Sequence, residues 1–472
     1  MVAKEGITET HYVLHRHLAE LLAADKENVE QVLLLVHELD CAEPTEVPPK
    51  FDGRLLVWHR MTFDWADAKN CTDAVLQHRQ REREHRHIWE GAIFWPNPNK
   101  PSVSKLRSAG PAVRFLRALF DSSVDFMLFQ RELIEQLKQF DFNVGVGEVG
   151  TGDLSISVLR EFPTIKKYVG TQSTSPPISQ WKYLGYDRIE ALFLRALNRS
   201  LLSRNVYGEL ITHERFSSWD VEHRMDLYFT NVQPFLDFPV VEQEIERERQ
   251  MHIENRVNFI GGITMPKGVV PKLNGDTKQI FESANSENEN GGVVLLSFGS
   301  VVEMNDGEAH AVAVKNIVVD VFKQYPQMNM IIKWGKRAPI GTGEQYKKLA
   351  DNVYAKSWLE QSAILDGGLK LFITHGGQNS INEAVKSGVP LILFPFFGDQ
   401  FNNAEALAAR GVAKVIDIRS KTLKNDFEEA LNEMLTNYAE YKQKMDELST
   451  KMNAVEPEKE FIEKFRQLRK SI

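Results

Sequence analysis

The chain has 472 residues, which is too long for one hydrophobic core and predicts two domains, since single cores rarely grow beyond about 250 to 300 residues. Hydrophobic residues make up 42% and charged residues 26% of the chain, and this composition excludes global disorder. The net charge of -8 excludes a coat for nucleic acid or anionic lipid, and the two cysteines, Cys41 and Cys71, exclude a disulfide framework.

The N-terminal half begins with MVAKEGITET, a stretch that lacks the apolar core of a signal peptide. Beyond it, the spacing of apolar residues predicts a helix over residues 15–24 and a strand over 31–36. The charged run at 77–89 is typical of a solvated helix face, because its basic residues alternate with glutamates that disfavour a nucleic-acid patch. Regular elements resume with a predicted helix over 124–139 and a strand over 142–149.

The C-terminal half alternates apolar runs with helix-forming stretches, which is the pattern of a parallel sheet covered on both faces. The predicted strands are residues 293–298, 328–333, 353–357, 369–374, 390–394 and 412–416, with a helix over 309–325. The longest apolar runs fall far short of the roughly 20 residues that span a bilayer. We therefore expect a soluble α/β protein whose C-terminal half is doubly wound.

A strand in this half ends in His375-Gly376-Gly377 and precedes a helix whose first turn carries Asn379 and Ser380. The start of a helix offers unpaired backbone N–H groups and the positive end of its dipole, and glycines let a phosphate approach them closely. Asn379, Ser380 and the imidazole of His375 add hydrogen-bond donors. The junction predicts a diphosphate site without a lysine or a metal, and a tight turn with a structural histidine is the alternative.

Flanking residues supply the other parts of a nucleotide-sugar site. Trp358 offers a flat ring on which a nucleobase can stack, and Gln361 follows it closely in the sequence. Glu383 comes one helical turn into the helix, where its carboxylate can accept hydrogen bonds from ribose hydroxyls. Asp399 and Gln400 form a pair suited to two adjacent sugar hydroxyls. The joint spacing of these residues, rather than any single one, favours a functional interpretation.

The segments SWLEQSAIL and LFITHGGQNSINEAVKSGVPLILFPFFGDQFNNA resemble the signature of the UDP-glycosyltransferases, particularly the animal drug-conjugating type. The resemblance continues in VVLLSFGSVV and implies a GT-B fold, in which two Rossmann-like domains face a central cleft. The implied parts are an acceptor-binding domain over 1–257, a linker region over 258–292, a nucleotide-sugar-binding domain over 293–425, and C-terminal helices over 426–472 that pack back across the domains.

By this resemblance Trp358 would stack on uracil, with Gln361 beside it, and Glu383 would hold the ribose. Asp399 and Gln400 would bind hydroxyls of the donor sugar. The residues implied around the diphosphate are Ser300, His375, Gly376, Gly377, Asn379 and Ser380. The resemblance thus implies a UDP-sugar as co-substrate and no tightly bound cofactor. It requires no metal, because the helix dipole and hydrogen-bond donors stabilise the leaving UDP.

The family uses a histidine near the N-terminus as the base that deprotonates the acceptor hydroxyl in an inverting displacement. Thr10-His11 followed by LHRHLAELLA resembles that segment, so the implied catalytic pair is His11 and Glu148, where the family more usually has an aspartate. His15 and His17 are rivals for the role of base. Together with His11 they have a spacing that could bind zinc, although a surface role is the favoured interpretation.

One departure from the family pattern and one glycine motif keep other functions open. Family members carry an apolar strand directly before the catalytic histidine, and residues 1–9 cannot form one, so we expect the sheet to lack its first strand. This departure motivates a second hypothesis, a catalytically silent UDP-sugar-binding or regulatory protein. A third, a dinucleotide oxidoreductase, comes from the GxGxxG spacing of Gly145, Gly147 and Gly150, and it is disfavoured because these glycines fall partly inside a predicted strand.

The resemblance therefore implies a hexosyltransferase of the detoxifying type, which moves a hexosyl or glucuronosyl group from a UDP-sugar to a hydroxyl of a small lipophilic acceptor. Nucleic acid is not an expected partner, and the sequence leaves the formation of a homo-oligomer undecided. Membrane association and a location at the endoplasmic reticulum membrane or in its lumen are implied by the resemblance alone.

Overall fold

The structure is a computed structural model of the chain. It describes residues 9–38, 56–62, 140–148, 162–174, 225–251, 257–265, 275–284, 291–299, 309–334, 345–396 and 399–472, with single positions at 135, 137, 138, 159, 272, 273, 302 and 304. The predicted charged run at 77–89 and most of the predicted helix at 124–139 lie outside these residues. So do residues 1–8, where the missing first strand was expected.

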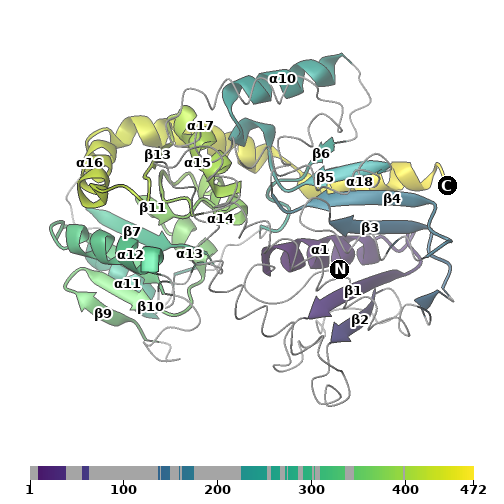
Figure 1. The fold of residues 1–472 in the computed structure, drawn as a ribbon, viewed down its shortest axis with the longest axis horizontal. Helices are drawn as coiled ribbons and strands as arrows, with labels where there is room; N and C mark the ends of the chain where they lie inside the picture. Colours follow the sequence, from purple (N-terminus) through teal and green to yellow (C-terminus); the bar gives the residue numbers. More distant parts are fainter. Residues whose placement is uncertain are drawn as a thin grey trace, which may run out of the picture. The chain divides into compact units, whose positions relative to one another are not determined.

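The chain divides into two compact units, and both are discontinuous in sequence. Unit 1 comprises Met1–Asn231, Glu244–Thr264 and Glu456–Ile472. Unit 2 comprises Val232–Gln243 and Met265–Val455. Each has a parallel sheet of its own (Figure 1).

Unit 1 contains a four-stranded parallel sheet in the order β3-β4-β5-β6 and a parallel pair of strands, β1 and β2. The strands are β1 (Val32–Glu38), β2 (Leu56–Thr62), β3 (Val144–Glu148), β4 (Lys167–Gln172), β5 (Leu227–Thr230) and β6 (Val257–Phe259). The helices α1 (Glu9–Ala24) and α18 (Pro457–Arg469) pack on this unit, and α10 (Pro239–Gln250) precedes β6 in the sequence. The predicted helix at 15–24 and strands at 31–36 and 142–149 are confirmed.

The core of unit 1 joins its first and last helices to the sheet. Leu14, Leu18 and Leu22 of α1 recur on one face at helical spacing and are buried together with Phe461 of α18. The ring of Phe461 lies edge-on to that of Phe229 in β5, with 4.9 Å between the ring centroids. Figure 1 shows the yellow α18 beside the strands of this sheet. The C-terminal helix therefore completes the N-terminal core.

Unit 2 is built on a seven-stranded sheet in the order β13-β12-β11-β7-β8-β10-β9, parallel except that β9 runs antiparallel to β10. The strands are β7 (Gly292–Ser297), β8 (Met328–Lys333), β9 (Lys347–Ala350), β10 (Val353–Lys356), β11 (Leu371–Thr374), β12 (Leu391–Leu393) and β13 (Ala413–Val415). All predicted strands of this half are confirmed. The sequence analysis missed β9, whose residues KKLA are polar and only partly buried.

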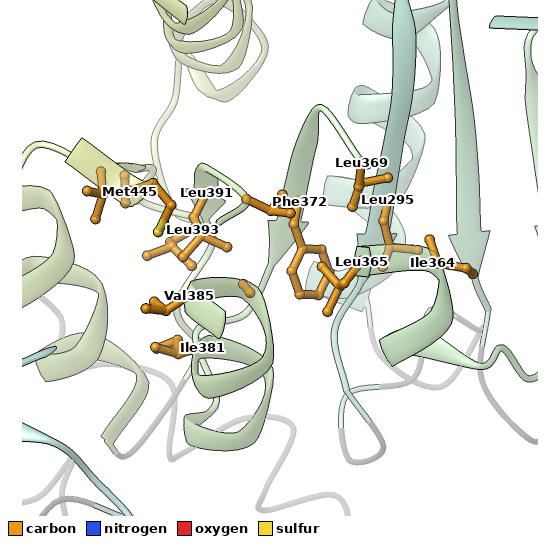
Figure 2. Close-up of a cluster of buried hydrophobic side chains, with 14 of the residues drawn as sticks. Leu295, Ile364, Leu365, Leu369, Phe372, Ile381, Val385, Leu391, Leu393 and Met445 are labelled. Atoms are coloured by element: carbon orange, nitrogen blue, oxygen red, sulfur yellow. The ribbon is translucent and has the colours of Figure 1, made fainter. Parts of the chain in front are cut away.

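Helices join parallel strands of unit 2 that follow one another in the sequence, with α12 between β7 and β8, α13 between β10 and β11, α14 between β11 and β12, and α15 between β12 and β13. The helices of this unit are α11 (Gly275–Ala284), α12 (Ala309–Phe322), α13 (Gln361–Asp366), α14 (Gln378–Lys386), α15 (Asp399–Ala409), α16 (Leu423–Thr436) and α17 (Tyr438–Ala454), and a short 3-10 turn, η4 (Pro234–Leu236), also belongs to it. Figure 2 shows Phe372 of β11 against Leu365 of α13 in the buried cluster, and Leu391 and Leu393 of β12 near Met445 of α17.

The order in which strands are added to the unit 2 sheet changes side at β7, in the centre of the sheet. From β7 the chain first adds β8 and β10 on one side, and later adds β11, β12 and β13 on the other. The register pairs Ser297 with Thr374, the last residues of β7 and β11. Ligands of such sheets bind beyond the carboxyl ends of the strands where the order reverses. The place to look for a site is therefore the edge formed by the ends of β7 and β11.

Among the described residues, no helix is both long and apolar enough to cross a membrane. The same residues contain no group of three or more His, Cys, Asp and Glu side chains arranged to hold a metal ion. His17, one member of the predicted zinc alternative, instead lies 3.2 Å from a carboxylate oxygen of Glu458 in α18. The location implied by the resemblance stays a prediction.

Candidate functional site

The loop that follows β11 is the centre of the candidate site. It runs through His375, Gly376 and Gly377 into α14, as the sequence predicted. Gly376 has a φ of 89°, a left-handed conformation that only glycine adopts readily. Its carbonyl accepts a hydrogen bond from Asn403 Nδ2 of α15 at 3.0 Å. The loop is thus held in place by a side chain from the following helix.

The start of α14 offers backbone donors beyond this loop. Gly377 is the N-cap residue, and because it has no side chain it cannot cap the N–H groups of the first turn. Ser380 in that turn is buried and Asn379 is partly buried. Helix N-termini of this kind bind anions through their N–H groups and their dipole. The predicted diphosphate residues His375, Gly376, Gly377, Asn379 and Ser380 therefore share one strand-to-helix junction.

His375 is buried between the ends of β7 and β11. Its Nδ1 lies 3.1 Å from Thr374 Oγ1, and a β-carbon added to Gly299, just after β7, would lie 2.8 Å from its Cε1. Burial, and secondly the charge of Lys333, lower the pKa of His375 from 6.5 to about 3. The imidazole is therefore neutral at physiological pH and has one N–H to donate. Thr374 can donate to Nδ1, which leaves Nε2 as the donor nitrogen.

The close approach of Gly299 to His375 gives a testable prediction. Gly299 (φ 78°) and Gly368 (φ 91°) both have left-handed backbones, but a β-carbon at 368 would meet open space. Gly368→Ala should therefore cost about 1–2 kcal/mol of backbone strain alone. Gly299→Ala should cost about 1 kcal/mol more and displace the imidazole. Urea unfolding of both variants measures the difference, and equal costs would show that position 299 does not constrain His375.

Gln361 links three elements of the site. Its Oε1 accepts a hydrogen bond from Ser297 Oγ of β7 at 3.1 Å, and its Nε2 donates to Glu383 Oε2 of α14 at 2.5 Å. The same Nε2 lies 3.5 Å from Ser380 Oγ. Burial raises the pKa of Glu383, and the bond from Gln361 opposes that rise. The amide of Gln361 thus orients the carboxylate that is predicted to hold a ribose.

Trp358 lies in the loop after β10 and exposes 42% of its surface, which is unusual for such a large apolar side chain. The ammonium of Lys333, the last residue of β8, is 4.1 Å from the centroid of its ring. An exposed indole beside a buried polar network is suited to stack on a flat ligand.

The two residues predicted to bind the donor sugar, Asp399 and Gln400, begin α15. Asp399 Oδ2 accepts a hydrogen bond from Asn403 Nδ2 at 3.0 Å, and Gln400 Oε1 accepts one from the backbone N–H of Phe396 at 2.8 Å. Both side chains therefore have structural roles at the edge of the loop. Ser300 lies outside the described residues.

In unit 1 the predicted carboxylate Glu148 ends β3 and is buried. Its Oε1 accepts hydrogen bonds from Ser173 Oγ at 2.8 Å and from the Ser173 backbone N–H at 3.1 Å. Its Oε2 is 4.0 Å from Nδ1 of His15, whose Nε2 is 2.6 Å from Thr171 Oγ1. The structure thus brings Glu148 to the rival His15. The predicted base His11 lies in α1 one helical turn earlier, and its side chain is outside the described residues.

Two of the three glycines that suggested a dinucleotide fold do not lie in a phosphate loop, and the third, Gly150, is outside the described residues. Gly145 and Gly147 lie inside β3, paired with Tyr168 and Gly170 of β4. A dinucleotide fingerprint needs such glycines in the turn between a strand and a helix. The structure therefore removes the only feature that favoured an oxidoreductase.

Sequence reasoning missed several residues that build the site. Lys333 carried a signal, since a lysine ends a strand that is fully buried and mostly apolar. Asn403 and Ser297 carried none, because their roles depend on contacts between elements distant in sequence. The same holds for Thr171 and Ser173, which follow from the pairing of strands in unit 1.

The chain matches the family model described as UDP-glucoronosyl and UDP-glucosyl transferase over residues 238–458. It is 32% identical to human UDP-glucuronosyltransferase 1A6 over 203 residues, which is 42% of this chain and 34% of that protein. It is 31% identical to the Caenorhabditis briggsae UDP-glucuronosyltransferase ugt-47 over 244 residues, 50% of this chain and 40% of that protein. The chain thus spans well under half the length of these relatives.

Two solved structures resemble the whole chain in fold. One is a UDP-glucose: anthocyanidin 3-O-glucosyltransferase in complex with UDP, with a TM-score of 0.57 and 15% identity over 98% of this chain and 96% of that one. The other is Os79 from O. sativa in complex with UDP, with a TM-score of 0.59 and 14% identity over 99% of this chain and 100% of that one. At this level of identity the likeness concerns the fold, and it confirms the predicted α/β GT-B class.

Proposed function

Because the chain belongs, through residues 238–458, to the UDP-glucuronosyl and UDP-glucosyl transferase family, we propose that it binds a UDP-sugar at the carboxyl edge of the unit 2 sheet and transfers the sugar. The acceptor in this proposal is a hydroxyl of a small lipophilic molecule. The observation that supports it best is the junction of β11 and α14, where a neutral His375 and uncapped N–H groups lie at the point of strand reversal.

Each part of the nucleotide has a proposed contact. Uracil stacks on the exposed ring of Trp358, and the ribose hydroxyls donate to Glu383, which Gln361 orients. The diphosphate accepts hydrogen bonds from the residues at the junction, namely Ser300, His375, Gly376, Gly377, Asn379 and Ser380. Asp399 and Gln400 are proposed for the sugar hydroxyls. The helix dipole and these donors then stabilise the charge that develops on the leaving UDP, without a metal in the mechanism.

The proposed transfer is an inverting displacement at the anomeric carbon. His11 removes the proton of the acceptor hydroxyl while the oxygen attacks, and the C–O bond to the UDP breaks on the opposite side. Glu148 is proposed to orient the base and to stabilise the imidazolium that forms. The burial of Glu148 among Ser173 and His15 supports a carboxylate held in one orientation.

Loss of the His375 imidazole is expected to weaken UDP binding. His375→Ala removes a donor to a charged phosphate, a hydrogen bond worth about 1.5–3 kcal/mol, so the Kd for UDP should rise about 10- to 150-fold. Isothermal titration calorimetry with UDP measures this change. His17→Ala, which removes an imidazole on the surface of unit 1, is the control and should leave the Kd unchanged. Unchanged UDP affinity in His375→Ala would refute the assignment of the diphosphate site.

A transfer assay separates the enzyme from a silent binding protein. The chain is incubated with UDP-glucose or UDP-glucuronic acid and a panel of phenols, and products are detected by mass spectrometry. A glycosylated phenol supports the proposed transfer. UDP binding by calorimetry without any glycosylated product would favour the silent alternative. The structural argument for that alternative is the approach of His15 to Glu148.

A further inference from the structure

Lys333 is a buried cation that the proposed function does not use. It is the last residue of β8, and the register places it next to Ser297 at the carboxyl edge of the sheet, since Leu296 pairs with Ile332. Only 8% of its surface is exposed. Burying an ammonium group is costly unless nearby groups compensate for the lost hydration. A lysine at this place therefore needs a structural or functional reason.

The ring of Trp358 provides one such group. Lys333 Nζ is 4.1 Å from the ring centroid, well within the range in which a cation is attracted to the face of an indole. Because Lys333 is itself buried, the face that it covers is the inner face of the ring. Despite this contact, 42% of the surface of Trp358 is exposed. The indole thus contacts a buried cation and still exposes a large part of its surface.

The field of Lys333 also reaches the other residues of the site. Its positive charge contributes to the lowered pKa of His375 and opposes the raised pKa of Glu383. The ammonium therefore lies near the residues assigned to the phosphates and to the ribose, although its observed contact is with the indole.

We propose that Lys333 is a positioning residue of the nucleotide site, which holds the indole of Trp358 from its inner face so that the outer face is fixed as the platform for the nucleobase. This inference rests on the proposed function and adds a residue to its site. A partly exposed side chain in a loop has rotamer freedom, and this freedom is lost when a base stacks on the ring. The cation reduces that loss by fixing the ring before the ligand arrives.

The experiment compares UDP with uridine in Lys333→Met, Trp358→Ala and the double variant. Calorimetry gives the Kd of UDP, and competition against UDP gives that of uridine. Lys333→Met keeps the length of the side chain but removes its charge, and it should weaken both ligands equally, by about 3- to 30-fold. In the Trp358→Ala background the same change should have no further effect, because the ring that it positions is absent. Lys333→Arg, which keeps the cation, should restore affinity to within about 3-fold of the original.

A second lysine supplies a matched control. Lys315 of α12 is also 8% exposed, and its Nζ is 4.0 Å from the ring centroid of Trp334. Lys315→Met should leave the Kd of both ligands unchanged. Thermal melting identifies any variant that does not fold, and Lys333→Gln replaces Lys333→Met if the latter fails.

Three results would overturn the inference. The first is an unchanged Kd in Lys333→Met. The second is a loss of affinity for UDP but not for uridine, which would mean that the ammonium acts on the phosphates directly. The third is a double variant in which the losses of affinity of the two single variants add. Failure of the proposed function is distinguishable from these results. In that case the unmodified protein would not bind UDP, or Trp358→Ala would bind UDP as tightly as the unmodified protein does.

Discussion

Replacing His11 with alanine is expected to reduce the rate of sugar transfer about 10²- to 10⁴-fold and to leave the affinity for UDP unchanged. The rate falls because the acceptor hydroxyl is a poor nucleophile until its proton is removed during attack. The affinity stays because the residues proposed to hold UDP all belong to unit 2, whereas position 11 lies in α1 of unit 1. Initial rates with a saturating UDP-sugar and calorimetry with UDP measure the two quantities separately.

The control for this prediction is His15, which lies one helical turn later in α1. Its ring is buried, with Nε2 2.6 Å from Thr171 Oγ1 and Nδ1 4.0 Å from Glu148, so it is poorly placed to meet a substrate. His15→Ala should therefore lower the free energy of unfolding by about 1–3 kcal/mol, because it leaves buried polar groups without a partner. If a folded His15→Ala loses transfer while His11→Ala retains it, the base is His15.

The fold of unit 2 was predictable because its strands are buried on both faces. Such strands read as continuous apolar runs, as in VVLL of β7 and LFI of β11, and all six predicted strands are present. The strand β9 was missed because it is not buried on both faces. It lies at the edge of the sheet, and two lysines in four residues give it no apolar run.

The candidate site was predictable where a residue acts through its own place in the chain. His375, Gly376 and Gly377 lie at a strand-to-helix junction, and this geometry follows from local sequence alone. The role of Asn403 in fixing the loop could not be predicted. This residue lies in α15, 26 residues beyond Gly377, and only tertiary packing brings its side chain to the loop. Gln400 accepts a bond from the backbone of Phe396, which is close in the sequence, but the signature did not indicate this structural role.

Unit 1 shows why a histidine cannot be assigned a role from spacing alone. His11 and His15 are four residues apart in α1, so both positions occupy the same helix face, and their spacing does not tell which one meets the carboxylate of Glu148. The sequence placed Glu148 at the end of a strand correctly, and the pairing of β3 with β4 then brings Thr171 beside it. That pairing creates the partner of His15 that the linear sequence does not contain.

His375 is expected to make the folded protein less stable in acid. Its pKa is about 3 in the folded protein and 6.5 in an unfolded chain, so between these values the unfolded state binds more protons. The contribution of His375 to the free energy of unfolding should therefore be nearly constant above pH 6.5 and fall as the pH drops from 6.5 towards 3. At 1.36 kcal/mol per pH unit, the part of this loss between pH 7 and pH 5 is about 2 kcal/mol.

Glu383 acts in the opposite direction, so a variant is needed to isolate the contribution of His375. The raised pKa of Glu383 means that its folded carboxyl keeps a proton longer, and its contribution to stability is lost as the pH rises above 4.5. Urea unfolding of the unmodified protein and of His375→Gln, each at pH 7 and pH 5, removes this shared term. The unmodified protein should lose about 2 kcal/mol more than the variant. An equal loss would mean that the folded protein protonates His375 by pH 5, so that an imidazolium with two N–H donors, rather than a neutral ring with one, would face the phosphates in mild acid.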